Sequence, residues 1–146
     1  MLSLKAYLKL IYKPFLIVLF ISVNALITYK IRLGGGFYIC NQGIAFGIPL
    51  NIITSSLMLS IILVLLYIYY IKLLPKINIL AQIGFFFILC GAISNLIDRL
   101  LYSCIIDYIN IFPTIIPLFN IADIFIFMGS LSIFIALGRN LSNNCL

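Results

Sequence analysis

The sequence predicts an all-α membrane protein with four transmembrane helices, and its composition is the first evidence for this fold class. Apolar residues make up 65% of the 146 residues, and the mean hydropathy is +1.30. A soluble domain is usually about one quarter charged, whereas charged residues make up only 8% of this chain. Such a chain cannot cover a water-facing surface with polar groups, so we expect it to lie in a lipid bilayer.

The second observation is the spacing of the apolar stretches. A transmembrane helix needs roughly 20 mostly apolar residues, and four stretches meet or approach this length, at about residues 14–29, 52–71, 77–97 and 121–138. A tight polar hairpin with Lys72, Pro75 and Lys76 separates the second stretch from the third. We expect a single membrane domain over residues 1–146.

The loops at about residues 30–51 and 98–120 then lie on the other side of the membrane from this hairpin. Both loops are apolar for exposed segments. We therefore expect them to lie on the membrane surface or to fold over a site.

The positions of the basic residues predict that both termini are cytoplasmic, because cytoplasmic segments carry an excess of Lys and Arg. Six of the nine cations are then inside: Lys5, Lys9, Lys13, Lys72, Lys76 and Arg139. The three outside are Lys30, Arg32 and Arg99. We interpret the net charge of +6 as a topology signal or a contact with anionic lipid, and we expect no nucleic-acid partner.

The missing residue types exclude several chemistries. The chain has no His, so it has no Ser-His-Asp triad, no Cys-His pair and no histidine metal site. Its three acids, all Asp, are too few for a calcium or magnesium cage. We expect neither a metal nor another cofactor.

All three acids fall on the outer face of the predicted topology. Asp98 closes the third apolar stretch, Asp107 lies in the second outer loop and Asp123 begins the fourth stretch. Carboxylates are costly within a membrane and are therefore functional candidates. The alternative is that these acids are helix caps and solvated loop charges at the membrane interface.

The neighbours of the acids sharpen this hypothesis. Asn95, Asp98 and Arg99 are spaced i, i+3, i+4, so that Asn95 shares a helix face with both others. Asn120 is a good N-cap for a helix that starts after it. Asp123 would then lie in the first turn, where the helix dipole favours the ionised carboxylate.

Two carboxylates and a water suffice for aspartic peptide hydrolysis. Two neighbouring Asp side chains share a proton, because both cannot ionise cheaply. Asp107 and Asp123 form the best pair, with Asp107 on a flexible loop and Asp123 at a rigid helix end. Asp98, next to Arg99, is more plausibly a structural ion.

Three sequence blocks carry a family resemblance. Residues 90–99 and 105–108 read CGAISNLIDR and IIDY, residues 119–123 read FNIAD with Gly129 after them, and residues 41–46 read NQGIAF. Respectively, they resemble the GGALGNLIDR…VVDF, FNxAD…G and NTGAAF blocks of the lipoprotein signal peptidase (signal peptidase II) family. The resemblance covers about residues 14–138.

The resemblance implies a four-helix membrane peptidase with a small extracytoplasmic β-cradle and a helix or loop over the site. Members of this family are aspartic endopeptidases that cut signal peptides from bacterial prolipoproteins before a diacylglyceryl-modified cysteine. The implied partners are the prolipoprotein and membrane lipid, and we expect a monomer in the bacterial inner membrane, with the site on the periplasmic side. Asp107 and Asp123 match the catalytic pair. The matches to supporting or substrate-binding residues are Asn41, Asn95, Asp98, Arg99 and Asn120.

The chain departs from the family where a DQxTK-like motif is usual. Residues 24–28 read NALIT, so the acid of the motif is absent and Lys30 is out of register. Ser94 and Cys90 also replace glycines of the GGALGN block, and Ile44 replaces a small residue. We expect altered packing or lipid contact in this region but an intact pair of acids.

The remaining polar residues are interpreted as structural. The four cysteines contain no CxxC, which argues against a zinc or thioredoxin-like site. We expect them to be small packing residues, and pairing of Cys40 with Cys104 stays open. Ser55, Ser56 and Ser60 are interpreted as helix-packing or interhelical hydrogen-bonding residues. A transporter or channel subunit, or an inactive lipid- or lipoprotein-binding relative, remains the alternative function.

Overall fold

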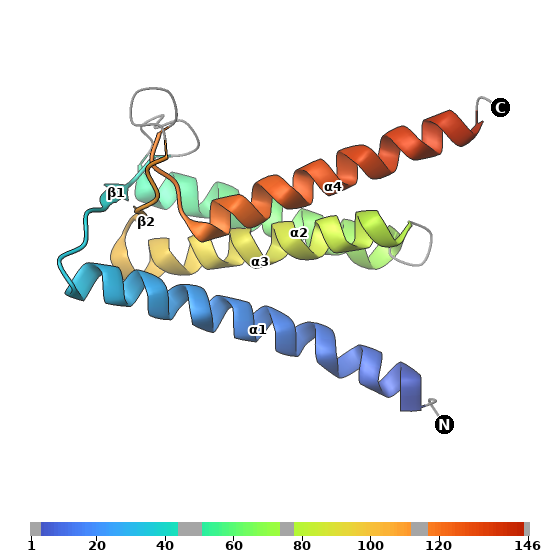
Figure 1. Ribbon diagram of the computed structural model, residues 1–146, viewed down its shortest axis with the longest axis horizontal. Helices are drawn as coiled ribbons and strands as arrows, with labels where there is room; N and C mark the ends of the chain where they lie inside the picture. Colours follow the sequence, from blue (N-terminus) through green and yellow to red (C-terminus); the bar gives the residue numbers. More distant parts are fainter. Residues whose placement is uncertain (1–3, 44–50, 74–77, 112–116, 145–146) are drawn as a thin grey trace.

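The computed structural model describes residues 4–43, 51–73, 78–111 and 117–144 (Figure 1). These residues form four helices, α1 (Leu4–Leu33), α2 (Ile52–Leu73), α3 (Ile79–Tyr102) and α4 (Ile121–Asn144), and two strands, β1 (Ile39–Asn41) and β2 (Ile105–Asp107). The sheet lies at one end of the helices, and α1 begins and α4 ends at the other end (Figure 1).

Three helices within the described residues are long and apolar enough to cross a membrane. They cover Phe15–Leu33, Ile79–Tyr102 and Ile121–Arg139, which agrees with the first, third and fourth predicted stretches. The apolar part found in α2, Ile53–Leu66, is shorter. The expected polar hairpin falls largely on residues 74–77, which lie outside the described residues.

All four helices end later than the apolar stretches that predicted them, because charged residues near the membrane interface do not break helical hydrogen bonding. The prediction ended α1 near residue 29 and α3 near residue 97, whereas they end at Leu33 and Tyr102. A left-handed residue follows each end, Gly35 with a φ of 69° and Ser103 with a φ of 59°. This conformation turns the chain out of a helix.

Helix α3 is central and packs most closely on α4. A Cβ atom added to Gly91 would lie 2.3 Å from the Ala122 carbonyl oxygen, and one added to Gly84 would lie 2.7 Å from that of Gly129. The two backbones therefore touch, as small residues allow in membrane helix pairs. Helix α4 lies close to α3 near the sheet and diverges from it toward its C-terminus (Figure 1).

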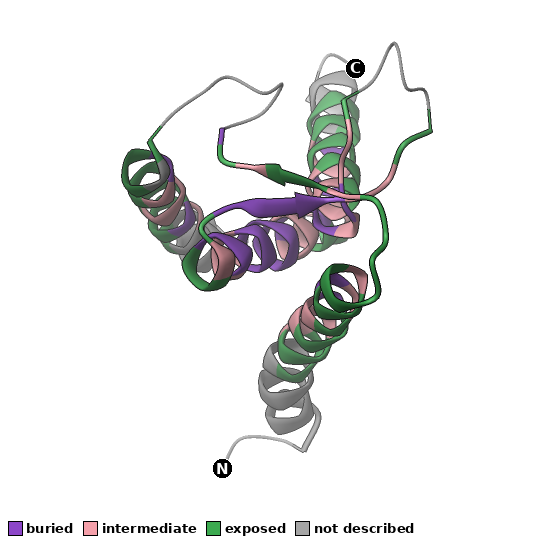
Figure 2. Cartoon of the chain, turned by 90° about the vertical axis from the view of Figure 1, so that its left-hand side faces the viewer, coloured by how far each residue is buried: buried purple, intermediate pink, exposed green. Residues whose placement is uncertain are grey.

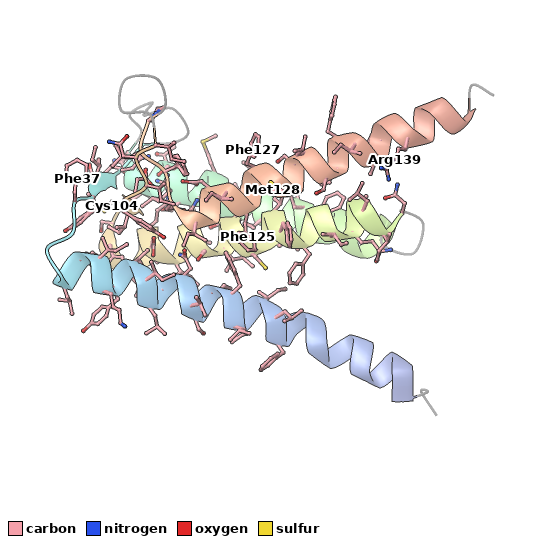
Figure 3. The ribbon with its side chains drawn as sticks, in the orientation of Figure 1. Phe37, Cys104, Phe125, Phe127, Met128 and Arg139 are labelled. Carbon is pink, nitrogen blue, oxygen red and sulfur yellow. A yellow bond between two sulfur atoms is a disulfide. The ribbon has the colours of Figure 1, made fainter. Side chains whose placement is uncertain are left out.

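Helix α1 contacts α3 through buried polar residues in the region of the missing family motif. Asn24 is 2% exposed, and its Nδ2 atom donates a hydrogen bond to Ser94 Oγ at 2.8 Å. Phe125 points from α4 toward α1, and its ring centroid lies 3.9 Å from that of Phe20 (Figure 3). Asn24 and Ser94, two residues at which the sequence departs from the family blocks, thus form one hydrogen-bonded pair between α1 and α3.

Strands β1 and β2 form an antiparallel pair in which Ile39 lies opposite Asp107 and Asn41 lies opposite Ile105. Figure 2 shows that β2 is buried, whereas much of β1 is exposed. Beyond β2, Ile109 pairs with Phe119 and leads the chain back to the start of α4. The helix beside the site that the resemblance implies is not among the described residues of the two loops. Residues 44–50 and 112–116 lie outside them.

A disulfide joins Cys40 of β1 to Cys104, the residue before β2 (Figure 3). The expectation of simple packing residues is therefore wrong for these two cysteines. It is confirmed for Cys90, which is buried with a free thiol. Antiparallel pairing brought together two cysteines that are far apart in sequence, and their spacing along the chain gave no sign of this.

Candidate functional site

The first turn of α4 is fixed by a reciprocal cap. The Asp123 backbone amide donates to Asn120 Oδ1 at 3.0 Å, and the Asn120 backbone amide donates to Asp123 Oδ2 at 3.1 Å. This is the capping-box arrangement, with Asp at the third helical position. The predicted N-cap is confirmed, and the cap holds the Asp123 carboxylate in one orientation.

The side chain of Asn120 also reaches the second acid. Its Nδ2 atom donates to Asp107 Oδ1 at 2.9 Å and to Asn95 Oδ1 at 3.2 Å. Asn95 in turn donates from Nδ2 to Asp123 Oδ1 at 2.8 Å. Two asparagines therefore link the two carboxylates, and Asn120 is completely buried between them.

Asn41 completes the surroundings of Asp107 from strand β1. Its Nδ2 atom donates to Asp107 Oδ2 at 3.0 Å, while its Oδ1 atom accepts the Gly43 backbone amide at 3.0 Å. Each of the four carboxylate oxygens of Asp107 and Asp123 thus accepts one amide hydrogen bond. A carboxylate oxygen accepts about two hydrogen bonds, so each keeps capacity to accept one more hydrogen bond.

Asp107 does not lie on a flexible loop as predicted. It is the last residue of β2 and is 3% exposed. Alternation in the outer loop was too short to reveal this strand. Burial raises the pKa of Asp107 to about 6, the charge of Asp123 raises it too, and hydrogen bonds from Asn41 and Asn120 lower it. The carboxyl therefore holds a proton more readily than an exposed Asp.

The next residue, Tyr108, adds a phenol to the same region. Its Oη atom is buried and faces the backbone amide of Ile121 at the start of α4. Burial raises the pKa of Tyr108, and the charges of the three acids raise it further. The phenol stays neutral near neutral pH and leaves the negative charge of the site on the carboxylates.

Asp98 and Arg99 point to different parts of the structure and do not form the expected pair. Asp98 is 2% exposed and interacts with the Ile106 backbone amide, Thr28 and Arg32. Arg99 donates instead to Ser55 Oγ and to backbone carbonyls in the segment after β1. Adjacent residues on a helix are about 100° apart, so one faces α1 and β2 while the other faces α2.

The sequence reasoning missed the carbonyl groups that Arg99 binds, those of Gln42 and Gly43. Every residue has a carbonyl, so no sequence signal could have identified them. Ser55 was assigned correctly as an interhelical hydrogen-bonding residue, but its partner was not foreseen. Among the described residues, no three His, Cys, Asp or Glu side chains lie close enough together to hold a metal ion.

Comparisons with known proteins all indicate the same family. A family model described as signal peptidase (SPase) II matches residues 10–139. A lipoprotein signal peptidase from Wigglesworthia glossinidia brevipalpis is 39% identical over 99 residues, which is 64% of each chain. One from Staphylococcus aureus (strain JH9) is 34% identical over 105 residues, 70% of this chain and 64% of that relative. The matched region thus spans slightly less than two thirds of these relatives' length.

Two solved structures share the fold. A bacterial membrane enzyme determined by the in meso method at 2.3 Å is similar with a TM-score of 0.74 and 26% identity, over 90% of each chain. A second, determined at 1.9 Å, has a TM-score of 0.67 and 26% identity, over 86% of this chain and 92% of that one.

Proposed function

Because the chain belongs to the signal peptidase II family, we propose that it cleaves the signal peptides of diacylglyceryl-modified bacterial prolipoproteins before the lipidated cysteine. It is a multi-pass inner-membrane protein of mostly helical fold. One observation in the structure carries the proposal. Asp107 and Asp123 come from different elements and are bridged by Asn120, which binds both carboxyl groups.

Asp107 and Asp123 act as an aspartic dyad. The ionised carboxylate takes a proton from water as the water attacks the scissile carbonyl, and the protonated carboxyl donates a hydrogen bond to that carbonyl. When the intermediate collapses, a proton passes to the leaving amine. The raised pKa of Asp107, about 6, supports a proton that the pair shares, and the apparent pKa values belong to the pair.

The amide groups around the dyad influence the ionisation of its two carboxyl groups. Asn41, Asn95 and Asn120 each offer N–H donors to carboxylate oxygens, and such donors favour ionised carboxylates. They oppose the effect of burial, so that one charge remains in the pair. Asp98 supports the site through the backbone of β2, and Arg99 supports it through the segment after β1.

We further propose that α2 is the fourth span, that both termini are cytoplasmic and that the sheet lies on the periplasmic side. The start of α1 and the end of α4 lie at the end of the molecule opposite to the sheet (Figure 1), which fits termini on one side. A disulfide at the sheet fits an oxidising compartment. A periplasm-dependent reporter should be active when inserted at Gly35 and inactive when fused after Arg139, and the reverse result contradicts this topology.

We also propose that the protein works as a monomer on a prolipoprotein and membrane lipid, without nucleic acid. Chromatography with light scattering in detergent measures the oligomeric state. A stable dimer that alone is active would contradict the monomer.

The test of the dyad is turnover of a diacylglyceryl-modified prolipoprotein by the purified protein. Asp107→Asn and Asp123→Asn should each abolish cleavage and keep the thermal unfolding transition. Asp98→Asn, at the remaining acid, should lower cleavage without abolishing it, since Asp98 supports the site through the backbone of β2 and accepts no hydrogen bond from the residues that bridge the dyad. Normal processing by either dyad variant would refute the assignment. Flux in proteoliposomes without a new peptide N-terminus would instead indicate a transporter.

A further inference from the structure

Ser55 is a polar side chain within an apolar helix, and it makes a short contact to the site. The residue is 2% exposed, and its Oγ atom accepts a hydrogen bond from Arg99 Nη1 at 2.6 Å. A hydrogen bond to a charged donor is stronger than one between neutral groups. Ser55 therefore holds the Arg99 guanidinium from the side of α2.

The same guanidinium binds the segment that follows β1. Arg99 Nη1 donates to the Gln42 carbonyl at 3.3 Å, and Nη2 donates to the Gly43 carbonyl. Its Nε atom is buried and has no hydrogen-bond partner among the described residues. The orientation of the rigid, planar group thus depends on its Nη contacts. Among the described residues, Ser55 supplies the contact that lies outside this segment.

Gly43 passes this constraint to Asn41. The Gly43 amide donates to Asn41 Oδ1 at 3.0 Å, and Asn41 Nδ2 donates to Asp107 Oδ2 at 3.0 Å. An asparagine side chain has an acceptor end and a donor end. Because the Gly43 amide occupies the acceptor, the donor end faces the acid. A shift of Gly43 would release this orientation.

We propose that Ser55 is a positioning residue for the peptidase reaction. Through Arg99 and Gly43 it keeps the amide of Asn41 directed at Asp107. The inference rests on the proposed function of the dyad and extends the site to α2, a helix that contributes no carboxylate.

The proposal predicts a pH effect that a merely structural role would not produce. The hydrogen bond from Asn41 lowers the pKa of Asp107, so loosening that bond raises the pKa. The other charged or titratable groups that face Asp107 are Asp98, Arg99, Asp123 and Tyr108. A substitution of Ser55 replaces none of the four, but it frees the Arg99 guanidinium, whose charge also lowers the pKa of Asp107. A shift of this charge away from Asp107 raises the pKa in the same direction as the loss of the Asn41 hydrogen bond.

The experiment compares three single variants in prolipoprotein cleavage across acidic to neutral pH. Ser55→Ala should lower kcat by roughly tenfold, the effect of about one hydrogen bond on the transition state, with little change in KM. The acidic limb of its pH profile of kcat should move to higher pH. Ser55→Thr keeps the hydroxyl and should restore both. Ser60→Ala is the matched control, because Ser60 Oγ donates to the Ser56 carbonyl of its own helix at 2.8 Å.

The proposal is overturned if Ser55→Ala has the same kcat as Ser60→Ala and the same position of the acidic limb in the pH profile of cleavage. Should Ser55→Ala fail to fold, Ser55→Cys replaces it, since a thiol has nearly the same volume and is a weaker acceptor. The same results are expected of this variant.

A second measurement separates this inference from the proposed function. Infrared difference spectra, with Asp107→Asn as the reference, follow the carboxyl band of Asp107 during titration without any substrate. Ser55→Ala should raise this midpoint, whether or not the protein cleaves prolipoproteins. An unchanged midpoint overturns the role of Ser55, while absent cleavage by the unsubstituted protein overturns only the proposed function.

Discussion

Asn120 serves two purposes with different atoms, which makes its roles separable by mutation. Its Oδ1 atom and backbone amide form the cap of α4, whereas its Nδ2 atom binds Asp107 and Asn95. The cap needs only a short acceptor. The bridge between the acids needs the longer amide.

Asn120→Ser should therefore keep the cap and lose the bridge, because serine is as good an N-cap as asparagine but has no amide donor. Asn120→Ala should lose both and cost about 1 kcal/mol more in unfolding free energy. Both variants should lose at least tenfold in kcat, from one or more lost hydrogen bonds. Turnover and denaturant unfolding in detergent check this. Equal stability of the two variants would argue against the capping role.

Asn41 sets the acidity of the site, because its hydrogen bond opposes the effect of burial on Asp107. In Asn41→Ala the pKa of Asp107 should rise above about 6. The dyad must lose one proton to act as a base, so the acidic limb of kcat/KM should move to higher pH. The pH profile of cleavage measures this directly.

Asn78→Ala is the matched control, since Asn78 caps α3 by accepting the Ala81 amide at 2.8 Å, at the end of α3 opposite to Asp98. Asn78→Ala should lower the stability of the protein without moving the acidic limb of kcat/KM. A limb that stays in place in Asn41→Ala would contradict the assigned role of Asn41.

The contact between α3 and α4 determines how far apart Asn95 and Asp123 lie. The Cβ position of Gly91, one turn before Asn95, lies against the backbone carbonyl of Ala122, the residue before Asp123. The hydrogen bond from Asn95 to Asp123 is 2.8 Å long, so a small displacement of α4 breaks it. The spacing of the two helices is thus part of the site.

Gly91→Ala should separate the helices, because the new Cβ would lie 2.3 Å from the Ala122 carbonyl oxygen and 2.8 Å from Ile126 Cγ1. We expect a destabilisation of about 1–3 kcal/mol, typical of overpacking, and a kcat reduced by at least tenfold. Gly138→Ala is the control, since nothing lies within 4 Å of its added Cβ. Thermal unfolding and turnover measure both effects. Equal behaviour of the two variants would contradict the close contact.

At the scale of the whole molecule, sequence reasoning succeeded where the signal was long or local. Long apolar stretches predicted α1, α3 and α4, and the cap at Asn120 followed from residue type and position. The strand that carries Asp107 is three residues long, too short for an alternating pattern to stand out. Contacts between distant segments, such as that of Ser55 with Arg99, depend on tertiary packing and have no signature in the spacing of residues.

The disulfide couples the sheet to the rest of the molecule, and its effect on turnover can be measured. Breaking it should loosen β1, which carries Asn41, and lower kcat. The expected loss of stability is about 2–4 kcal/mol. Cys40→Ser and treatment of the unsubstituted protein with a dithiol should have similar effects. Cys90→Ala, which keeps the disulfide, serves as the control. Full activity after complete reduction would show that strand pairing alone positions Asn41.

The same bond has a topological consequence. Cys40 and Cys104 are 64 residues apart, so the bond closes a covalent ring that contains all of α2 and α3. A protease that cuts the backbone anywhere inside this ring produces a nicked protein whose two pieces stay joined. Such fragments migrate together in a non-reducing gel and separate only after reduction, and the helices of the ring keep their neighbours after the chain is cut.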